Sequence, residues 1–471
     1  MVDDRPQPLN DDLAFTPALD QAALVRAGDV SPLELVELYL ERIERLDPQL
    51  NAYVTVDADG ARAAAQAPVE GPFRGVPIPI KDLNETAGLR TTYSCRAFAD
   101  YVPKADAAVV RRIREAGFVI IGKTNTPELG SIGMTESELN GDCRNPWDVS
   151  RTPGGSSGGA AAALAAGLCP VAHGTDGGGS IRIPASCCGL VGLKPSRGRV
   201  SPAPFSSGSL GLGSSGPIAR TVRDAAALLD VMEGYEPGDS YVAPPPARPF
   251  LAETYAEPGR LRIAVTSDPP SPVPVDPNCT AALESAADLL EDLGHDVFEQ
   301  TPPWQTDEMI VHFIRVWQVG PATSGVEDVS QLEPINRMLA ESARTTPSPQ
   351  HAASIMELQQ IARRVVAFWD DVDVVVTPTL ALQPVPVGWT WDGTDGDPHR
   401  AFAAQTLFTP FTPLVNVTGQ PAMSLPLHWS EAGLPIGVQF IGRPFAEATL
   451  IRLAAQLEQA RPWLDRRPPT R

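Results

Sequence analysis

Alternating runs of apolar and polar residues predict a series of amphipathic helices and short buried strands. One helix is expected to begin at Ser31, where a proline and a glutamate follow at the spacing of a capping box. One face of this helix is marked by apolar residues at Val36, Leu40, Ile43 and Leu46. Further helices are predicted over residues 107–116, 160–166, 279–293 and 351–368. Strands are predicted over residues 76–80, 118–121, 261–265, 372–376 and 435–441.

The mixture of helices and strands in this order predicts an α/β fold. Two proline-rich stretches, residues 241–250 and 268–277, are interpreted as surface crossings within one unit. The sequence shows no internal repeat and no low-complexity tail. A single domain over residues 1–471 is therefore expected.

Composition and charge narrow the possible partners. The chain has 471 residues, of which 43% are hydrophobic and 20% charged, which is typical of a soluble globular protein. Its net charge of −20 argues against nucleic acid or an anionic membrane as a partner. The N-terminus lacks the basic start and apolar stretch of a secretory signal. The longest near-apolar run, residues 158–172, is shorter than the ~20 residues that span a bilayer. A cytoplasmic protein is predicted.

The cysteines and histidines provide no metal site. The six cysteines form no C-x-x-C pair, so they are interpreted as small buried side chains in a reducing compartment. The six histidines are scattered without an H-x-x-x-H pair. No metal and no cofactor are therefore predicted.

Two clusters rich in glycine and serine, residues 151–159 and 174–184, are the most informative segments. A Gly/Ser loop before a helix can bind phosphate through its free N–H groups, or it can be a plain turn. The G-x-x-x-x-G-K-[ST] motif is absent, and G-x-G-x-x-G does not follow a convincing strand. Taken singly, neither cluster decides between a structural and a functional role.

The combination of the two clusters with a third element is more specific. Two glycine-flanked serines, Ser156 and Ser180, follow Lys81 at the end of a predicted strand. This set resembles the amidase signature family. The resemblance extends to residues 187–201, 121–128 and 416–422, so it covers nearly the whole chain.

The resemblance implies that Ser180 is the nucleophile, Ser156 a bridging serine and Lys81 the base. A serine hydroxyl is a weak nucleophile, so a neighbour must accept its proton. A lysine can do so only when neutral, which requires burial or nearby positive charge. A hydroxyl both donates and accepts, so Ser156 can relay the proton. We expect Ser156 Oγ to lie within hydrogen-bond reach of both Lys81 and Ser180. In the family the bond corresponding to Gly155–Ser156 is cis.

The residues around the nucleophile have implied roles as well. The backbone N–H groups of Gly177, Gly178 and Gly179, together with that of Ser180, are expected to form the oxyanion hole, because glycine lets the backbone approach a substrate closely. Gly177 departs from the commonest family pattern, which has threonine or a larger residue there. The two charged residues that flank this loop, Asp176 and Arg182, are interpreted as its structural support.

The resemblance also implies a large mixed, twisted β-sheet core covered by helices on both faces. The catalytic core is predicted at about residues 70–230 and 405–460, and a variable substrate-pocket region at about 300–400. This region contains the aromatic residues Trp304, Phe313, Trp317, Trp389 and Trp391.

The aromatic content of the variable region suits an apolar pocket, and no charged cluster is visible there. We therefore expect hydrolysis of neutral aliphatic or aryl amides to an acid plus ammonia or an amine, through an acyl-enzyme. The only expected partner is this small molecule, with an ester or a carbamate as alternatives to the amide, bound by a monomer or homodimer.

Three alternatives remain open. A urethanase, or a hydrolase of nylon-type cyclic oligoamides, could be built on the same scaffold. The glutaminase subunit of a tRNA-dependent amidotransferase is disfavoured, because Ile183 stands where those subunits typically have glutamine. A catalytically inactive binding protein is disfavoured, because all three triad positions are filled.

Other polar residues near the motifs receive structural interpretations. Lys123 and Lys194 are predicted to be structural or solvated. Asp82 is discounted as a counter-ion of Lys81, because adjacent residues in a strand point to opposite faces. Ser157 is expected either to join the hydrogen-bond network or to cap the following helix.

Overall fold

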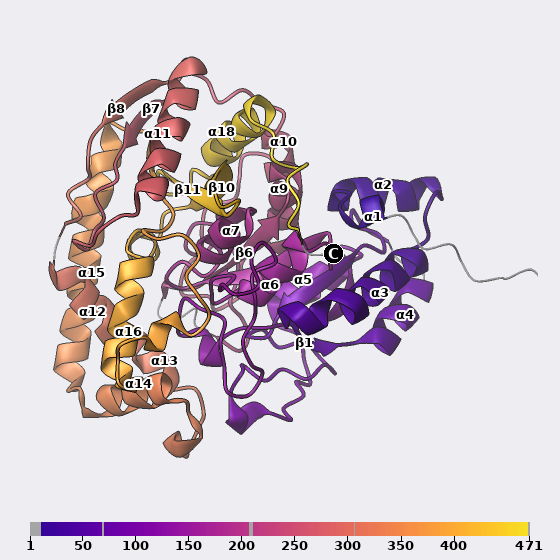
Figure 1. Cartoon of the computed structure of the whole chain (residues 1–471), viewed down its shortest axis with the longest axis horizontal. Coiled ribbons are helices and arrows are strands. Elements are labelled where there is room, and N and C mark those ends of the chain that lie inside the picture. The colour runs from indigo at the N-terminus through magenta and orange to yellow at the C-terminus, as the bar shows by residue number, and fades with distance from the viewer. Residues whose placement is uncertain (1–10, 68–69, 207–210, 306, 470–471) are drawn as a thin grey trace, which may run out of the picture.

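The computed structural model describes residues 11–67, 70–206, 211–305 and 307–469 (Figure 1). The strands are β1 (Tyr53–Val56), β2 (Pro77–Lys81), β3 (Val119–Thr124), β4 (Val171–Asp176), β5 (Val191–Lys194), β6 (Ser214–Ala219), β7 (Arg262–Val265), β8 (Asp296–Glu299), β9 (Val374–Pro378), β10 (Ala422–Trp429) and β11 (Pro435–Gly442).

The helices of the first half are α1 (Asp11–Ala14), α2 (Ala18–Ala27), α3 (Pro32–Leu50), α4 (Ala58–Gln66), α5 (Ala108–Glu115), α6 (Gly158–Ala165), α7 (Arg182–Cys188), α9 (Val222–Met232) and α10 (Phe250–Glu253). Those of the second half are α11 (Pro277–Asp292), α12 (Asp307–Trp317), α13 (Val319–Ala322), α14 (Pro334–Thr345), α15 (Ser348–Val366), α16 (Pro398–Phe408), α17 (Pro413–Thr418) and α18 (Glu447–Ala460). Short 3₁₀ turns are η1 (Arg96–Phe98), η2 (Glu128–Gly130), η3 (Val329–Gln331), η4 (Ala367–Asp370) and η5 (Trp389–Trp391).

The core is an eight-stranded mixed sheet with the strand order β4-β6-β5-β10-β11-β9-β7-β8. Strand β7 pairs in parallel with β8 and β9, and the pairs from β4 to β9 are antiparallel. A second, three-stranded sheet has the order β1-β3-β2, with β2 and β3 parallel. The predicted mixed sheet is therefore confirmed, and the smaller sheet is an addition to it.

Helices cover both faces of the large sheet. In β9, Val374 and Val376 join a core shared with α9, α11 and α18, whereas Val375 joins a core shared with α12 and α15. Burial on both faces explains why β9 begins with three consecutive valines. In Figure 1, α12, α14, α15 and α16 gather on one side of the molecule, and α1 to α4 lie on the other.

The predicted elements are all present, with their ends displaced by a few residues. The start of α3 is as expected: Ser31 accepts a hydrogen bond from the Glu34 backbone, and the Glu34 carboxylate accepts one from the Ser31 N–H. This capping box satisfies two backbone donors at the helix start. The single domain over residues 1–471 stays a prediction.

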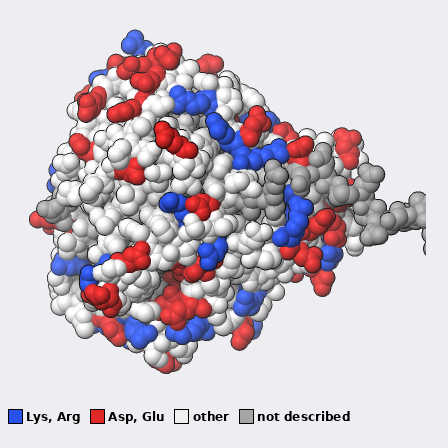
Figure 2. Space-filling model, in the orientation of Figure 1, with Lys and Arg blue, Asp and Glu red and all other residues white. Residues whose placement is uncertain are grey.

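All six cysteines are free and buried, which confirms their interpretation as small core side chains. In the described ranges, no helix combines the length and apolar character needed to cross a membrane. On the face in Figure 2, acidic and basic side chains are interspersed among uncharged ones.

Candidate active site

Lys81 lies at the end of β2 and is completely buried. Its Nζ is 2.7 Å from Ser156 Oγ and 2.9 Å from Thr175 Oγ1. The Gly155–Ser156 peptide bond is cis, as the resemblance implied. A Cβ atom at Gly155 would lie 2.7 Å from the Met134 backbone nitrogen, so only glycine fits there. The end of β2, the loop before α6 and the end of β4 thus meet at the lysine.

The environment of Lys81 favours its neutral form. Burial lowers the pKa of Lys81 well below its ordinary value, and the Asp176 carboxylate opposes this only in part. Within the described ranges no carboxylate lies at ion-pair distance from Lys81 Nζ. Asp82 instead accepts hydrogen bonds from Thr92 and lies 3.6 Å from Lys123 Nζ. Discounting Asp82 as the counter-ion of Lys81 was therefore correct.

Ser180 lies in the turn between β4 and α7 and lines a pocket. The Ser157 N–H donates to the Ser180 carbonyl at 3.2 Å, which fixes the backbone of the nucleophile candidate. The expected hydrogen bond between Ser156 and Ser180 is not formed, and in the part of the chain that the structure describes the Ser180 hydroxyl makes no hydrogen bond. This hydroxyl is therefore free to rotate.

The glycine loop before Ser180 differs in one respect from its expected role. The N–H groups of Gly177, Gly178 and Ser180 form no hydrogen bond with any described residue. The N–H of Gly179, however, donates to Asp176 Oδ1 at 2.8 Å. This donor is occupied by a carboxylate in the structure, and the assignment of Gly179 to the oxyanion hole stays a prediction.

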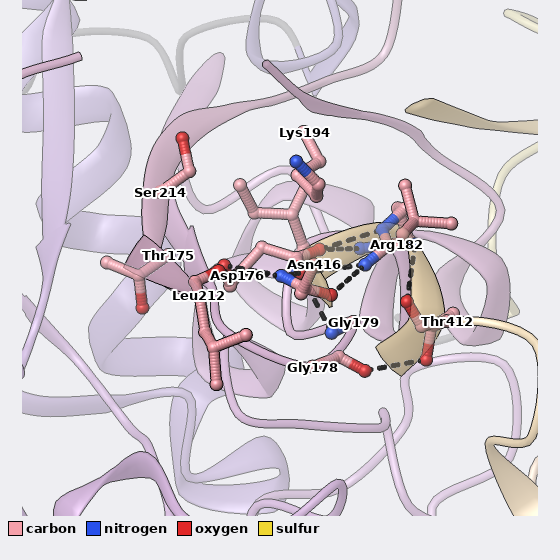
Figure 3. A network of polar contacts seen from close by, with 12 residues as sticks. Thr175, Asp176, Gly178, Gly179, Arg182, Lys194, Leu212, Ser214, Thr412 and Asn416 are labelled. Atoms are coloured by element: carbon pink, nitrogen blue, oxygen red, sulfur yellow. Dashed lines mark hydrogen bonds and ion pairs between the residues drawn. The ribbon is translucent and has the colours of Figure 1, made fainter. Parts of the chain in front are cut away.

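Asp176 and Arg182 form a buried ion pair that holds this loop (Figure 3). The guanidinium donates from Nε to Asp176 Oδ2 at 3.0 Å and from Nη2 to Oδ1 at 2.9 Å. Asp176 also accepts from the N–H groups of Gly179 and Ile181. Burial alone would raise the pKa of Asp176, but Arg182 and the hydrogen bonds hold it well below its usual range.

Three distant residues complete this network, and their roles were missed in the sequence. Asn416 Nδ2 donates to Asp176 Oδ1 at 2.9 Å, and Asn416 Oδ1 accepts from Arg182 at 2.7 Å. Arg182 also donates to Gln439 Oε1 at 2.7 Å and to the Thr412 carbonyl at 3.1 Å. Asn416 and Thr175 belong to segments that carry the family resemblance, so they could have been found. Thr412 and Gln439 carry no such signal.

Three further polar residues near the motifs make contacts within the fold. Lys194 is buried and donates to the Pro195 carbonyl, and burial together with Arg182 lowers its pKa to about 7. Lys123 is buried as well, so neither lysine is solvated. Ser157 makes no side-chain cap for α6; its hydroxyl contacts the Thr175 backbone instead.

The pocket at Ser180 is open to solvent. Its empty volume, including solvent space at the mouth, is about 700 Å³. Among the described residues that line it, none is charged. They are Gly130, Ser131, Ile132, Gly133, Gly178, Ser180, Ile183, Ser271, Met309, Ile310, Phe313, Ile314, Trp317, Phe402, Gln405, Thr406, Thr409, Pro410 and Pro413. Residues 309–317 of α12 contribute five apolar side chains to this lining, and Phe402 of α16 adds a further ring from outside the predicted 300–400 region.

Only two of the five aromatic residues singled out in that region line the pocket. Phe313 and Trp317 stack with ring centroids 5.4 Å apart. Trp304 is buried in the core, Trp389 packs against Phe408, and Trp391 packs in a small cluster below α14 and α16.

The amidase family model matches residues 34–451. AmiB2 of Mycobacterium tuberculosis, a provisionally named amidase, is 44% identical over 97% of this chain and 98% of its own. The structure of a 6-aminohexanoate cyclic dimer hydrolase with substrate superposes with a TM-score of 0.93 at 38% identity, covering 97% of this chain and 99% of that chain. A bacterial aryl acylamidase superposes with a TM-score of 0.85 at 29% identity, covering 95% and 97%.

The chain therefore belongs to the amidase family. It is a hydrolase that acts on carbon–nitrogen bonds other than peptide bonds, and its substrates are small-molecule amides.

Proposed function

We propose that the chain hydrolyses uncharged amides through an acyl-enzyme on Ser180. Lys81, in its neutral form, accepts the proton of Ser156, and Ser156 accepts that of Ser180. Ser180 Oγ then forms a bond to the amide carbonyl carbon. When the C–N bond breaks, the proton returns through Ser156 to the leaving nitrogen. Water then attacks the carbonyl carbon of the acyl-enzyme, and its proton passes through Ser156 to Lys81. When the ester bond to Ser180 breaks, the proton returns through Ser156 to Ser180 Oγ and the acid is released.

The position of Lys81 supports its role as the base. It lies 2.7 Å from Ser156 Oγ, and its pKa is lowered by burial. The free Ser180 hydroxyl must rotate toward Ser156 to complete the relay, and such contacts often tighten only when substrate is bound. The unbonded N–H groups of Gly177, Gly178 and Ser180 would stabilise the oxyanion of the tetrahedral intermediate.

The residues that line the pocket are expected to determine which amides bind. No charged side chain of the described residues lines it, and Ile183 and α12 make its walls largely apolar. A charged group buried there would lose its hydration without gaining a partner. Uncharged aliphatic and aryl amides therefore suit this site, and the α-ammonium and α-carboxylate of glutamine do not.

A cyclic oligoamide is a second candidate substrate. The neighbour with a TM-score of 0.93 is named as a hydrolase of the 6-aminohexanoate cyclic dimer, a substrate that carries no net charge. Such a ring is compatible with a pocket lined without charged residues. Carbamates would use the same nucleophile, and no contact in the pocket favours them over amides.

The test is kcat/KM for a neutral anilide, the 6-aminohexanoate cyclic dimer, a carbamate and glutamine, with Ser180→Ala as the blank. We expect the anilide to exceed glutamine by at least about 100-fold, because a site that leaves charged groups unpaired discriminates strongly against them. A preference for glutamine would refute the proposal that the pocket selects uncharged amides. A cyclic dimer well ahead of the anilide would identify the second candidate, and a carbamate ahead of both would identify a urethanase.

We also propose that the protein works in the cytoplasm as a monomer or homodimer, without nucleic-acid or membrane partners. Six free, buried cysteines suit a reducing compartment. The net charge of −20 disfavours polyanionic partners. Cell fractionation and light scattering test these points.

A further inference from the structure

The oxyanion loop and α12 approach each other closely at one point. A Cβ atom at Gly177 would lie 2.9 Å from both Cζ3 and Cη2 of Trp317. Carbon atoms of a side chain and a ring do not approach so closely without displacement. The indole of Trp317 therefore occupies the space that a side chain at position 177 would need.

The backbone itself does not require glycine at position 177. Its φ angle lies outside the left-handed region, whereas Gly179, two residues later, has a φ of +130°. A Cβ at Gly179 would also collide with the side chain of Thr412. At position 179 glycine is required both by the backbone φ and by the packing of neighbouring side chains. At position 177 it is required only because the ring of Trp317 fills the space.

Trp317 has little freedom to move aside. Its Nε1 donates to the Ser131 carbonyl at 3.0 Å, and its ring stacks on Phe313 one helical turn earlier. Both aromatic residues line the pocket together with Ser180. The indole therefore forms a fixed wall of the substrate pocket, directly against the oxyanion loop.

We propose that Gly177 and Trp317 form a complementary pair, in which the absent side chain of one admits the ring of the other. Trp317 is then a specificity-determining residue that favours planar, aryl-bearing amides over linear ones, because aromatic rings pack well on an aromatic wall. The substrate preference rests on the proposed amide hydrolysis at Ser180. The packing of the pair does not depend on it.

The experiment is a double-mutant cycle of Gly177→Ala, Trp317→Leu and the double variant. The probes are benzamide, 4-nitroacetanilide and hexanamide, so that an aryl ring is carried on the acyl side, on the leaving side or not at all. Gly177→Ala alone should lower kcat/KM at least about tenfold for all three probes, because the added methyl group displaces the ring or the loop. Trp317→Leu should lower the ratio of aryl to linear kcat/KM by about tenfold.

The decisive result is the coupling. In the Trp317→Leu background, Gly177→Ala should lower kcat/KM by less than about threefold, because the colliding ring is gone. If the fold-losses in kcat/KM of the two single variants simply multiply in the double variant, the complementary pair is overturned. An unchanged ratio of aryl to linear amides in Trp317→Leu would overturn its role in specificity.

Two controls sharpen the cycle. Gly179→Ala should be inactive with or without Trp317→Leu, because its obstacles are the side chains of Thr412 and Ile183 and its own φ of +130°. Gly320→Ala, just beyond Trp317 on α13, meets open space and should match the wild type.

A readout without activity separates the two proposals. If the wild type cleaves none of the amides, the proposed function fails, yet melting temperatures still test the pair. Gly177→Ala should lower the melting temperature clearly in the presence of Trp317, and much less in the Trp317→Leu background. If Gly177→Ala does not fold but the double variant does, the pair is supported. Equal losses of melting temperature in both backgrounds would refute it.

Discussion

The two sides of the pocket are held together by different forces. The glycine loop of residues 176–182 is positioned by directional bonds: the Asp176 carboxylate accepts hydrogen bonds from the side chains of Arg182 and Asn416 and from three backbone N–H groups. The wall formed by α12, which meets this loop at Trp317, is positioned mainly by apolar contacts such as the stack of Phe313 on Trp317, with one hydrogen bond from Trp317 Nε1 to the Ser131 carbonyl. Catalytic atoms need fixed positions, whereas a substrate-binding surface needs only a shape. Changes in the loop should therefore affect kcat, and changes in the wall should affect KM.

The largest effect is expected for the nucleophile. Ser180→Ala should lower kcat at least about 10⁴-fold, because no other group can form the acyl-enzyme. A fluorophosphonate should label Ser180 in the wild type and leave this variant unlabelled, as mapped by peptide mass spectrometry. Thermal melting serves as the folding control. A label on another serine would show that the nucleophile is misassigned.

The next effect concerns the proton relay. Lys81→Ala and Ser156→Ala should each lower kcat at least about 100-fold, the lower end for general acid–base catalysis. Because both residues belong to one relay, the double variant should lose little more than either single one. Near-normal turnover in folded Lys81→Ala would mean that another group takes the proton.

The pH profile tests the same relay through the pKa of Lys81, which burial lowers. A base works when deprotonated, so kcat/KM should rise with pH through this lowered pKa and then level off. An ordinary lysine, with a pKa of about 10.4, would still be gaining activity at pH 10. We therefore expect loss of activity on the acid side and a plateau below pH 10. A rate still rising at pH 10 would contradict a lowered pKa.

Removing the support of the loop should cost stability as well as activity. Asp176→Ala leaves the buried Arg182 guanidinium without its counter-ion, which typically costs about 3–5 kcal/mol of unfolding free energy. The matched control is Glu115→Ala, which removes the exposed partner of Arg111 and should cost less than about 1 kcal/mol. Urea unfolding measures both variants. Similar losses would mean that the buried pair has no special role.

Features that depend on local sequence could be predicted, whereas those that depend on distant parts of the chain could not. Regular elements such as α3 could be predicted, because their capping residues and apolar spacing are local. Lys81, Ser156 and Ser180 could be named through the motifs that carry the family resemblance, and the structure brings Lys81 and Ser156 together. The pairing of β1 with β3 could not be predicted, because an apolar run does not identify its partner.

Contacts across the fold were equally hidden. Asn416 reaches Asp176 from α17, and Trp317 reaches the oxyanion loop from α12, so each contact depends on the completed packing. The occupied N–H of Gly179 could not be foreseen either, since it depends on where the Asp176 carboxylate points. The aromatic residues of the 300–400 region show the same limit: composition indicated an apolar pocket, but not which rings line it.

The smallest effect is expected in the wall itself. Phe313→Leu removes one ring of the stack while keeping an apolar side chain, so folding should lose only about 1 kcal/mol. Because Phe313 lines the pocket and is not part of the proposed proton relay, KM for an aryl amide should rise about three- to tenfold with kcat nearly unchanged. Phe298→Leu, in β8 beside Arg262, is the matched control and should leave both constants unchanged. Steady-state kinetics on benzamide distinguish the outcomes. A fall in kcat as large as the rise in KM would show that the wall helps to position the catalytic loop, and the division between the two sides of the pocket would then be wrong.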